Sequence, residues 1–303
     1  MPRVIDKVRR DKHYSIPTVC KAFEITRDAY YKRRARTIKK NDIKDMVLSL
    51  IIEHRTDLPR AGGKKLYKAI IPELQTSGIK FGRDKLFDLL RDYNLLIRRR
   101  KKFITTTNSR HRFYKYGSLL KDFTPSGPNQ VWVSDITYIR KARGFCFLAL
   151  ITDAYSRKIV GHDLSDSLEL AGCLRALKRA LRQLPHRYNL IHHSDRGIQY
   201  CSNQYVNVLK KRRIKISMTE ENHCYENAIA ERVNGILKDE FFLDQFFQTT
   251  QLAKHACESA IKLYNFKRLH LSLNYKTPEM AHQKVAWIDC LTCRQISGQD
   301  KLP

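Results

Sequence analysis

The 303-residue sequence contains no hydrophobic run long enough to cross a membrane, which needs roughly 18 to 20 consecutive apolar residues. Its longest apolar stretch, Phe145 to Ile151, has the length of a buried strand. The first residues, Met1 to Asp6, lack the apolar centre of a secretory signal. We therefore expect a cytoplasmic protein.

The eight cysteines do not indicate a disulfide framework, because a chain of this length can bury its own apolar cores. We expect reduced thiols. Only Cys290 and Cys293 form a CxxC pair, and no second pair or His-x-x-x-His completes a tetrahedral zinc site. A lone pair is weak support for a metal site, so any role for it stays open.

Acidic residues are scarce: 30 Asp and Glu stand against 58 Lys and Arg, which gives a formal net charge of +28 at pH 7. Such an excess repels itself unless a polyanion lies against it, and this indicates a nucleic-acid partner. Residues 1–122 hold 32 basic and 13 acidic side chains, and residues 123–303 hold 26 and 17. We expect the N-terminal part to bind DNA in a salt-dependent way. A ribosome-associated or merely basic protein would show the same charge.

Residues 1–40 predict a helix-turn-helix-like segment. Four apolar residues fall at helical spacing before a turn at Ile25: Ile16, Val19, Cys20 and Phe23. Thr26 can cap a second helix, which is basic and aromatic: Arg27, Tyr30, Tyr31, Lys32, Arg33 and Arg34. Arg33 and Arg34 are candidate DNA contacts on such a helix. An ordinary helical hairpin with a charged, solvated face fits the pattern equally well.

Residues 41–97 predict a compact three-helix DNA-binding domain, because Gly62-Gly63 and a turn from Gly78 to Gly82 separate three apolar stripes. The stripes are Ile43, Met46, Val47, Leu50 and Ile51; Leu66, Ile70 and Leu74; and Leu86, Leu89 and Leu90. Residues 98–128 read as a basic linker laid along DNA, although a solvated tail would look the same. Its candidate DNA contacts are Arg98, Arg99, Arg100, Lys101 and Lys102.

Residues 129–285 alternate between strand and helix patterns, and residues 286–303 remain as a C-terminal tail. Strands are predicted at 131–139, 145–153 and 158–164, and the short turns between them indicate an antiparallel meander. A helix at 168–184, a strand at 188–193 and a helix at 204–212 follow. This order is that of a ribonuclease-H-like α/β core.

Three carboxylates in this region are candidate metal ligands. Asp135 interrupts an apolar strand, which is costly unless something positive neutralises it. Asp195 ends the next long strand, at the kind of sheet edge where ligands gather. Glu231 lies on a helix predicted over 226–242. Its face carries Asn227, Asn234, Gly235 and Lys238, and the buried stripe carries Ala228, Ile229, Val233, Ile236 and Leu237.

Oxygen ligands of this kind suit Mg²⁺ or Mn²⁺. Two such ions about 3.5–4 Å apart can activate one oxygen and stabilise another in an in-line attack on phosphorus. Each residue alone also has a structural explanation: Asp135 as an edge residue, Asp195 as a helix cap and Glu231 as part of a solvated face. Together, on elements in this order, the three favour a metal site.

Four segments resemble the long-frame (OrfB-type) transposases of the IS-three family of bacterial insertion sequences, which have a DDE integrase-like catalytic core. The segments are Trp132–Tyr138, His193–Tyr200, Cys224–Glu231 with Lys238, and Tyr264–Asn265 through Arg268–His270 to Tyr275–Pro278. Thirty-five residues separate Asp195 from Glu231, the interval of the D,D(35)E signature. The resemblance covers nearly the whole chain. Arg196, Ile198 and Glu226 depart from the commoner Gln, Ser and Asp.

The resemblance implies an α/β ribonuclease-H-like (retroviral integrase) catalytic core, preceded by N-terminal all-α, helix-turn-helix-type DNA-binding domains. It implies that Asp135, Asp195 and Glu231 hold two Mg²⁺ (or Mn²⁺) ions per active site, and that Lys238 contacts DNA near the cut end. The implied reaction is metal-dependent DNA cleavage and strand transfer, in which water frees a 3′-hydroxyl that then attacks another phosphodiester. An RNase-H-like nuclease without strand transfer and a catalytically inactive DNA-binding regulator stay open as alternatives.

The implied partners are double-stranded DNA, as terminal inverted repeats and as target, and further copies of the chain in a dimer or larger assembly on DNA. An upstream-frame protein joined as a fusion is a further implied partner, and the implied location is cytoplasmic and nucleoid-associated in a bacterium. Asn227, Arg268 and His270 are candidate DNA contacts, although a solvated helix end explains the last two nearly as well. His193 could orient Asp195 or a water, but a strand-end histidine is more often structural.

Overall fold

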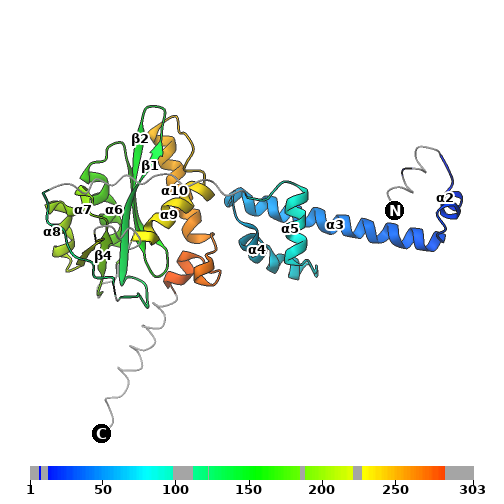
Figure 1. The fold of residues 1–303 in the computed structure, drawn as a ribbon, viewed down its shortest axis with the longest axis horizontal. Helices are drawn as coiled ribbons and strands as arrows, with labels where there is room; N and C mark the ends of the chain where they lie inside the picture. Colours follow the sequence, from blue (N-terminus) through cyan, green and yellow to red (C-terminus); the bar gives the residue numbers. More distant parts are fainter. Residues whose placement is uncertain are drawn as a thin grey trace, which may run out of the picture. The chain divides into compact units, whose positions relative to one another are not determined.

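The computed structural model describes residue 7 and residues 13–97, 112–121, 123–184, 188–220 and 227–283. It divides into a helical unit, Met1–Thr56 with Leu66–Leu96, and a second unit, Asp57–Lys65 with Ile97–Pro303 (Figure 1). We call the second one the catalytic unit because it contains the three candidate metal ligands. Several residues singled out in the sequence lie outside the described residues: Arg98, Arg99, Arg100, Lys101, Lys102, Cys224, Glu226, Cys290 and Cys293. Among the described helices, none combines the length and the apolar character that crossing a bilayer requires.

The N-terminal helical pair is built as the sequence predicts. Helix α2 (Ile16–Ala22) is followed by a turn and by α3 (Arg27–Asp57), and the Ala29 N–H donates to the Thr26 hydroxyl oxygen at 3.1 Å. Val19, Cys20 and Tyr30 are buried together. The sequence pattern suggested that Tyr30 lies on the DNA-contacting face of the second helix. In the structure it belongs instead to the core of the helical pair.

Helix α3 runs without interruption through residues 40 and 41, where the sequence interpretation placed a boundary between two segments. No glycine or proline occurs between Arg27 and Asp57, and the Lys- and Arg-rich stretch favours helix, so nothing ends the first helix there. Helices α4 (Gly63–Thr76) and α5 (Arg83–Asp92) complete the helical region. The three predicted stripes share one core, which contains Val47, Ile51, Leu66, Ile70, Leu74, Leu86, Leu89 and Leu90. Met46 is exposed at the edge of its stripe.

The catalytic unit is built on a five-stranded mixed sheet of order β3-β2-β1-β4-β5. Its strands are β1 (Val131–Arg140), β2 (Phe145–Asp153), β3 (Ile159–Ser165), β4 (Ile191–Ser194) and β5 (Lys215–Met218). The first three form the predicted antiparallel meander, β4 lies parallel to β1, and β5 lies parallel to β4. The sequence interpretation missed β5, because four residues carry too short a pattern to count as a strand.

Helices cover both faces of this sheet, with α6–α8 on one side and α9 and α10 on the other (Figure 1). The helices are α6 (Leu170–Arg182), α7 (Ile198–Cys201), α8 (Asn203–Lys211), α9 (Ala228–Glu240) and α10 (Thr250–Phe266), followed by the 3₁₀ turn η2 (Leu271–Leu273). Because strand side chains alternate, Trp132 packs with α6 and α8, whereas Val131 and Val133 pack with Ala230 of α9. Asp135 continues the second set and lies on the α9 face.

Candidate active site

Asp135 and Asp195 lie at neighbouring positions of two hydrogen-bonded strands. Ser134 of β1 pairs with Ser194 of β4 in parallel register, so the two aspartates follow paired residues. Asp195 is the first residue after β4, where its carboxylate accepts a hydrogen bond from the Gly197 N–H at 3.0 Å. Strand pairing thus brings together two carboxylates that are sixty positions apart in the chain.

Helix α9 packs on the face of the sheet that carries Asp135 and contacts this residue. Asn234 Nδ2 donates to Asp135 Oδ2 at 2.7 Å, and the Ile136 N–H donates to Asp135 Oδ1 at 2.9 Å. Glu231 precedes Asn234 by one helical turn and Lys238 follows it by one turn, so all three share the face turned to Asp135. The sequence assigned this face correctly but did not identify Asn234 as the residue that holds Asp135.

Two other residues of α9 lie differently from the prediction. Ala228, which was predicted in the buried stripe, is exposed. Ala230 is buried and occupies the stripe in place of Ala228. Asn227, predicted to contact DNA, is buried, and its Nδ2 donates to the Ser134 backbone carbonyl at 3.3 Å. The side chain is turned toward β1, which gives Asn227 a structural role in place of the predicted contact.

The electrostatics of the site are those of crowded carboxylates. Burial, the nearby charge of Asp195 and, more weakly, the charge of Glu231 together raise the pKa of Asp135 to about 7. The hydrogen bonds from Ile136 and Asn234 oppose this rise. Burial also lowers the pKa of Lys238, although the charge of Asp135 acts in the opposite direction. Asp135 is therefore a carboxylate whose ionised form needs a further positive charge.

The donor set suits a hard cation, because carboxylate oxygens are what Mg²⁺ and Mn²⁺ prefer. Across residues 13–97, 112–121, 123–184, 188–220 and 227–283, however, no three His, Cys, Asp or Glu side chains are close enough together to hold one ion. The two aspartates are adjacent, and Glu231 acts on Asp135 more weakly. A set of three ligands that includes Glu231 therefore remains a prediction.

The two strand-end histidines are both buried and serve different faces. His193 faces β5, with its Nδ1 2.8 Å from the Ser217 hydroxyl, so the predicted role toward Asp195 or water stays a prediction. His192 Nε2 lies 2.8 Å from the Ser134 hydroxyl and 3.0 Å from the Tyr205 hydroxyl. Burial lowers the pKa of His192 to about 3, which keeps it neutral. This second network ties β1, β4 and α8 together on the face of the sheet opposite Asp135, and the sequence interpretation missed it.

Arg268 and His270 do not form the exposed phosphate grip that the sequence suggested. The Arg268 guanidinium donates to both carboxylate oxygens of Glu240, at 2.7 and 2.8 Å, and the residue is 5% exposed. His270 is 6% exposed and packs edge-on against Tyr264. Both residues are held inside the fold because Glu240, at the end of α9, supplies the buried counter-charge. Arg33 and Arg34 lie exposed on α3, in the helical unit.

Comparison with known proteins agrees with this geometry. Two sequence profiles, each described as "Integrase core domain", match residues 125–224 and 212–278. The "Insertion element IS600 uncharacterized 31 kDa protein" of Shigella sonnei is 33% identical over 272 residues, covering 88% of this chain and 98% of that protein. "Transposase InsF for insertion sequence IS3A" of Escherichia coli (strain K12) is 30% identical over 283 residues, covering 90% and 97%. The chain belongs to the IS3 family of insertion-sequence transposases.

The transposase thus has the predicted α/β core of ribonuclease-H-like, retroviral integrase type behind N-terminal helices, and it is a DDE polynucleotidyl transferase. Among solved structures, the HTLV-2 integrase catalytic core domain in complex with magnesium aligns with a TM-score of 0.43 and 20% identity. That alignment covers 52% of this chain and 99% of the integrase domain. The family resemblance inferred from the four sequence segments is confirmed.

Proposed function

We propose that this transposase cuts and joins DNA at insertion-sequence ends with two Mg²⁺ (or Mn²⁺) ions held by Asp135, Asp195 and Glu231. The observation that supports this most is the paired placement of Asp135 and Asp195, where burial and crowding raise the pKa of Asp135. Two ions bound there would supply an activated attacking oxygen and stabilise the leaving one.

The chain's own residues would prepare this reaction by position and charge. Asn234 fixes the orientation of the Asp135 carboxylate through the 2.7 Å bond to Oδ2. Lys238, on the same face of α9, is placed to meet a DNA phosphate beside the carboxylates. A phosphate held there would be positioned near the attacking oxygen, which lowers the entropic part of the barrier.

The helical unit offers a surface for the DNA itself, which we call the basic groove. The groove, of about 490 Å³, lies between α3 and α5 and is lined by Arg36, Lys39, Lys40, Lys44, Lys80 and Lys85. Among the described residues of its lining, only Asp88 and Asp92 are acidic. Within the described part of the chain, none of the six basic side chains forms an ion pair. Such a surface suits a DNA backbone, because phosphate contacts made by Lys and Arg dominate the affinity for nucleic acid.

The partners and location follow from the same reaction. We propose that the DNA consists of terminal inverted repeats and a target duplex. Because two element ends must be handled together, we expect two or more copies of the chain on the DNA, joined with an upstream-frame protein as a fusion where one is made. The location we propose is the bacterial cytoplasm, on the nucleoid.

The decisive test supplies the full chain with a pre-cut 3′-hydroxyl end, target DNA and Mg²⁺, and follows the joined product on a denaturing gel. We expect joining by the parent, and a loss of at least about a thousandfold in Asp135→Asn and Glu231→Gln, because electrostatic stabilisation of this kind contributes that much to a rate. Asp239→Asn, an exposed carboxylate on the same helix, is the matched control and should keep the parent rate. Cleavage without joined product, or full activity in the two variants, would overturn the proposal.

A further inference from the structure

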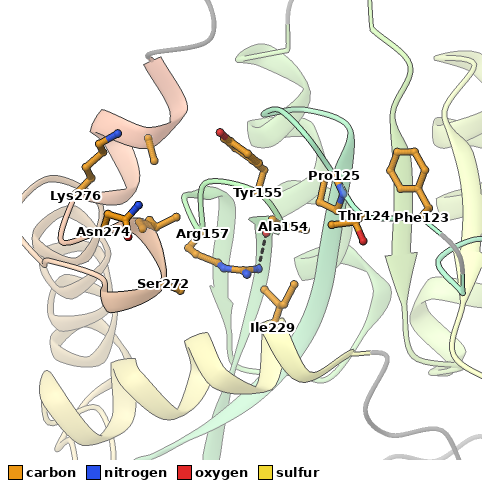
Figure 2. Close-up of a pocket in the computed structure, with 12 residues that line it drawn as sticks. Phe123, Thr124, Pro125, Ala154, Tyr155, Arg157, Ile229, Ser272, Asn274 and Lys276 are labelled. Carbon is orange, nitrogen blue, oxygen red and sulfur yellow. Dashed lines mark hydrogen bonds between the residues drawn. The ribbon is translucent and has the colours of Figure 1, made fainter.

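A cavity of about 520 Å³ in the catalytic unit has no part in the roles described above (Figure 2). Its walls come from the segment before β1, the turn between β2 and β3, the first turn of α9 and the loop after η2. The size is that of a site for a small ligand, which ranges from about 300 to 1,000 Å³. Two cations, Arg157 and Lys276, line the cavity, and none of the described residues in its lining is a carboxylate. The cavity therefore favours an anion.

The backbone around this cavity is strained at three positions. Arg157, Asn274 and Tyr275 have φ values of +64°, +53° and +60°, in the left-handed region that residues other than glycine adopt uncommonly. Arg157 and Asn274 line the cavity, and Tyr275 lies between Asn274 and Lys276. Strain of this kind persists only where the surroundings impose it, and it clusters at sites that bind ligands.

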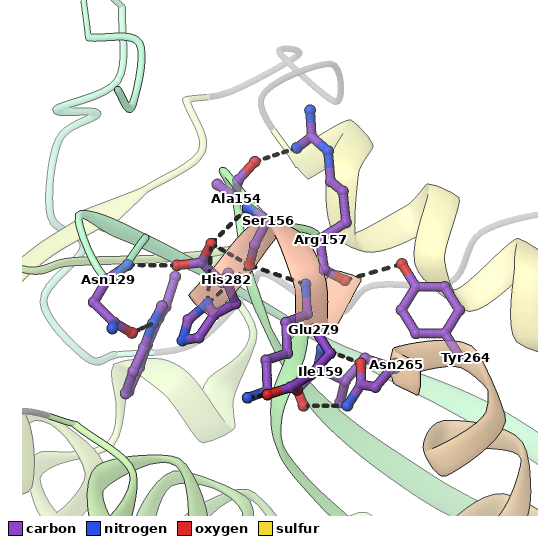
Figure 3. A network of polar contacts seen from close by, with 12 residues as sticks. Asn129, Ala154, Ser156, Arg157, Ile159, Tyr264, Asn265, Glu279 and His282 are labelled. Carbon is purple, nitrogen blue, oxygen red and sulfur yellow. Dashed lines mark hydrogen bonds and ion pairs between the residues drawn. The ribbon is translucent and has the colours of Figure 1, made fainter. Parts of the chain in front are cut away.

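A buried polar network imposes the conformation of Arg157 (Figure 3). Its N–H donates to the Asp153 carbonyl at 2.9 Å, and its carbonyl accepts from the Tyr264 hydroxyl at 3.0 Å. The Asp153 carboxylate is fully buried and accepts from the Asn129 N–H and from the Ser156 N–H and hydroxyl, each at 2.7 Å. The turn is thus fixed by residues from the segment before β1 and from α10.

The same turn is fixed from the C-terminal side. The Ser156 hydroxyl lies 2.9 Å from His282 Nδ1, and Lys158 forms a half-buried ion pair with Glu279 at 2.8 Å. The backbone of Lys276 is fixed nearby, because its carbonyl accepts from the His270 N–H and its N–H donates to the Leu273 carbonyl, both at 3.1 Å. The fold therefore fixes the backbone that carries each of the two cations.

The side chains are arranged for a group larger than a simple anion. Figure 2 shows Arg157 extending across the cavity between Tyr155 and Ile229, with Lys276 and Asn274 on one side and Thr124 and Pro125 on the other. Within the described residues, one guanidinium N–H of Arg157 donates to the Ala154 carbonyl, and the guanidinium has no other hydrogen-bond partner. Its remaining donors are available to a ligand, beside the flat ring of Tyr155.

We propose that this cavity binds one unpaired nucleotide of a DNA strand, with its phosphate at Arg157, its base against Tyr155, and Lys276 at the side of the cavity for the next phosphate of the strand. The proposal rests on the proposed function, which makes DNA the substrate. Arginine suits the phosphate because its planar fork makes two charge-assisted hydrogen bonds, and aromatic rings stack with any base. A duplex is too wide for a cavity of this volume, so the nucleotide must be unpaired. Ile229 in its wall precedes Glu231 by two residues, so the cavity and the active site share α9.

The test measures binding of the full chain, without divalent metal, to two fluorescent DNAs: a blunt duplex, and the same duplex with a short single-stranded overhang. We expect the parent to prefer the overhang, and Arg157→Asn and Lys276→Met each to reduce that preference about tenfold, as loss of one charge-assisted contact does. Asparagine tolerates the left-handed backbone, so Arg157→Asn preserves the turn. Lys262→Met, an exposed lysine of α10, is the matched control and should leave the preference unchanged.

The Tyr155→Ala variant distinguishes the contribution of the base contact to binding from that of the phosphate contact. It should weaken binding of the normal overhang and leave binding of an abasic overhang unchanged. A parent chain that binds both DNAs equally, or an abasic overhang bound as tightly as a normal one, overturns the nucleotide proposal while leaving the transposase reaction intact. A parent that binds neither DNA counts against the proposed function itself.

Discussion

The burial, hydrogen bonds and raised pKa of Asp135 make it the central residue of the candidate active site. It stands in a strand with apolar neighbours, its carboxylate is bonded by Asn234 and by its own strand, and Asp195 lies beside it. Burial and Asp195 both disfavour its charge, and they raise its pKa to about 7 from an ordinary value of 3.8. The residue is therefore unfavourable for folding at neutral pH until a cation joins it.

This shift predicts how stability depends on pH. Between pH 3.8 and about 7 the folded metal-free chain holds the Asp135 proton more tightly than the unfolded chain, so its free energy of unfolding should fall as pH rises. Asp135→Asn removes this dependence. The stability of the variant relative to the parent should therefore rise across the window by up to about 1.4 kcal/mol per pH unit. Urea unfolding at a series of pH values measures it, and parallel pH curves for parent and variant would contradict it.

At the scale of elements, α9 is the part of the structure on which the site depends. One face of it carries Glu231, Asn234 and Lys238 toward Asp135, and its last residue, Glu240, is bound by Arg268 and by Lys65 at 2.9 Å. Burial alone would raise the pKa of Glu240, but Arg268 and Lys65 outweigh burial and lower it. This buried cluster fixes the far end of the helix that presents the catalytic face.

Arg268→Met should lower the free energy of unfolding by about 3 kcal/mol, because removing one partner leaves a buried charge poorly compensated. Lys32→Met breaks an exposed pair with Asp28 and should change it by less than about 1 kcal/mol. Thermal unfolding of both variants makes the comparison, and Glu240→Leu combined with Arg268→Met should recover only part of the loss, because Lys65 then loses its carboxylate partner. Unchanged stability with weakened DNA binding would instead restore Arg268 to the DNA-contacting role expected from sequence.

At the scale of the whole molecule, charge is distributed for binding a polyanion. The net charge of +28 is concentrated toward the N-terminus, and the helical unit gathers six basic side chains in the basic groove. Three of them, Arg36, Lys40 and Lys44, recur every four residues along α3, about 6 Å apart. Such a row can follow the phosphates of one strand, each of which adds to the salt dependence of binding.

Neutralising two of these lysines, Lys39→Gln with Lys40→Gln, should reduce the slope of log affinity against log salt concentration by about 2, because each lost phosphate contact removes about 0.9. The effect should be the same for different DNA sequences, since phosphate contacts carry no base information. Lys178→Gln with Lys262→Gln, two exposed lysines of the catalytic unit, is the matched control. Fluorescence titrations at several salt concentrations measure the slopes, and equal slopes for all three proteins would remove the basic groove from the DNA contact.

The sequence by itself determined the class of the core and the succession of its first four strands along the chain. Alternating apolar strands, helical stripes and a carboxylate inside a strand are local patterns, and they were confirmed in β1 to β4, α6, α8 and α9. The family followed from four short segments. The sequence pattern did not predict β5, which is only four residues long. It also placed a segment boundary in the middle of α3, where no residue ends the helix.

Only the tertiary structure decided what each polar residue faces. Asn234 donates a hydrogen bond to Asp135, and Asn227 donates one to the backbone of β1. Arg268 forms a buried ion pair with Glu240. Arg157 lies in a turn with a left-handed backbone beside a cavity. None of these follows from spacing along the chain, because each depends on a partner tens of residues away or more. A polar side chain can contact DNA or stabilise the fold. Which of the two it does depends on whether tertiary packing places a buried hydrogen-bond or ion-pair partner beside it.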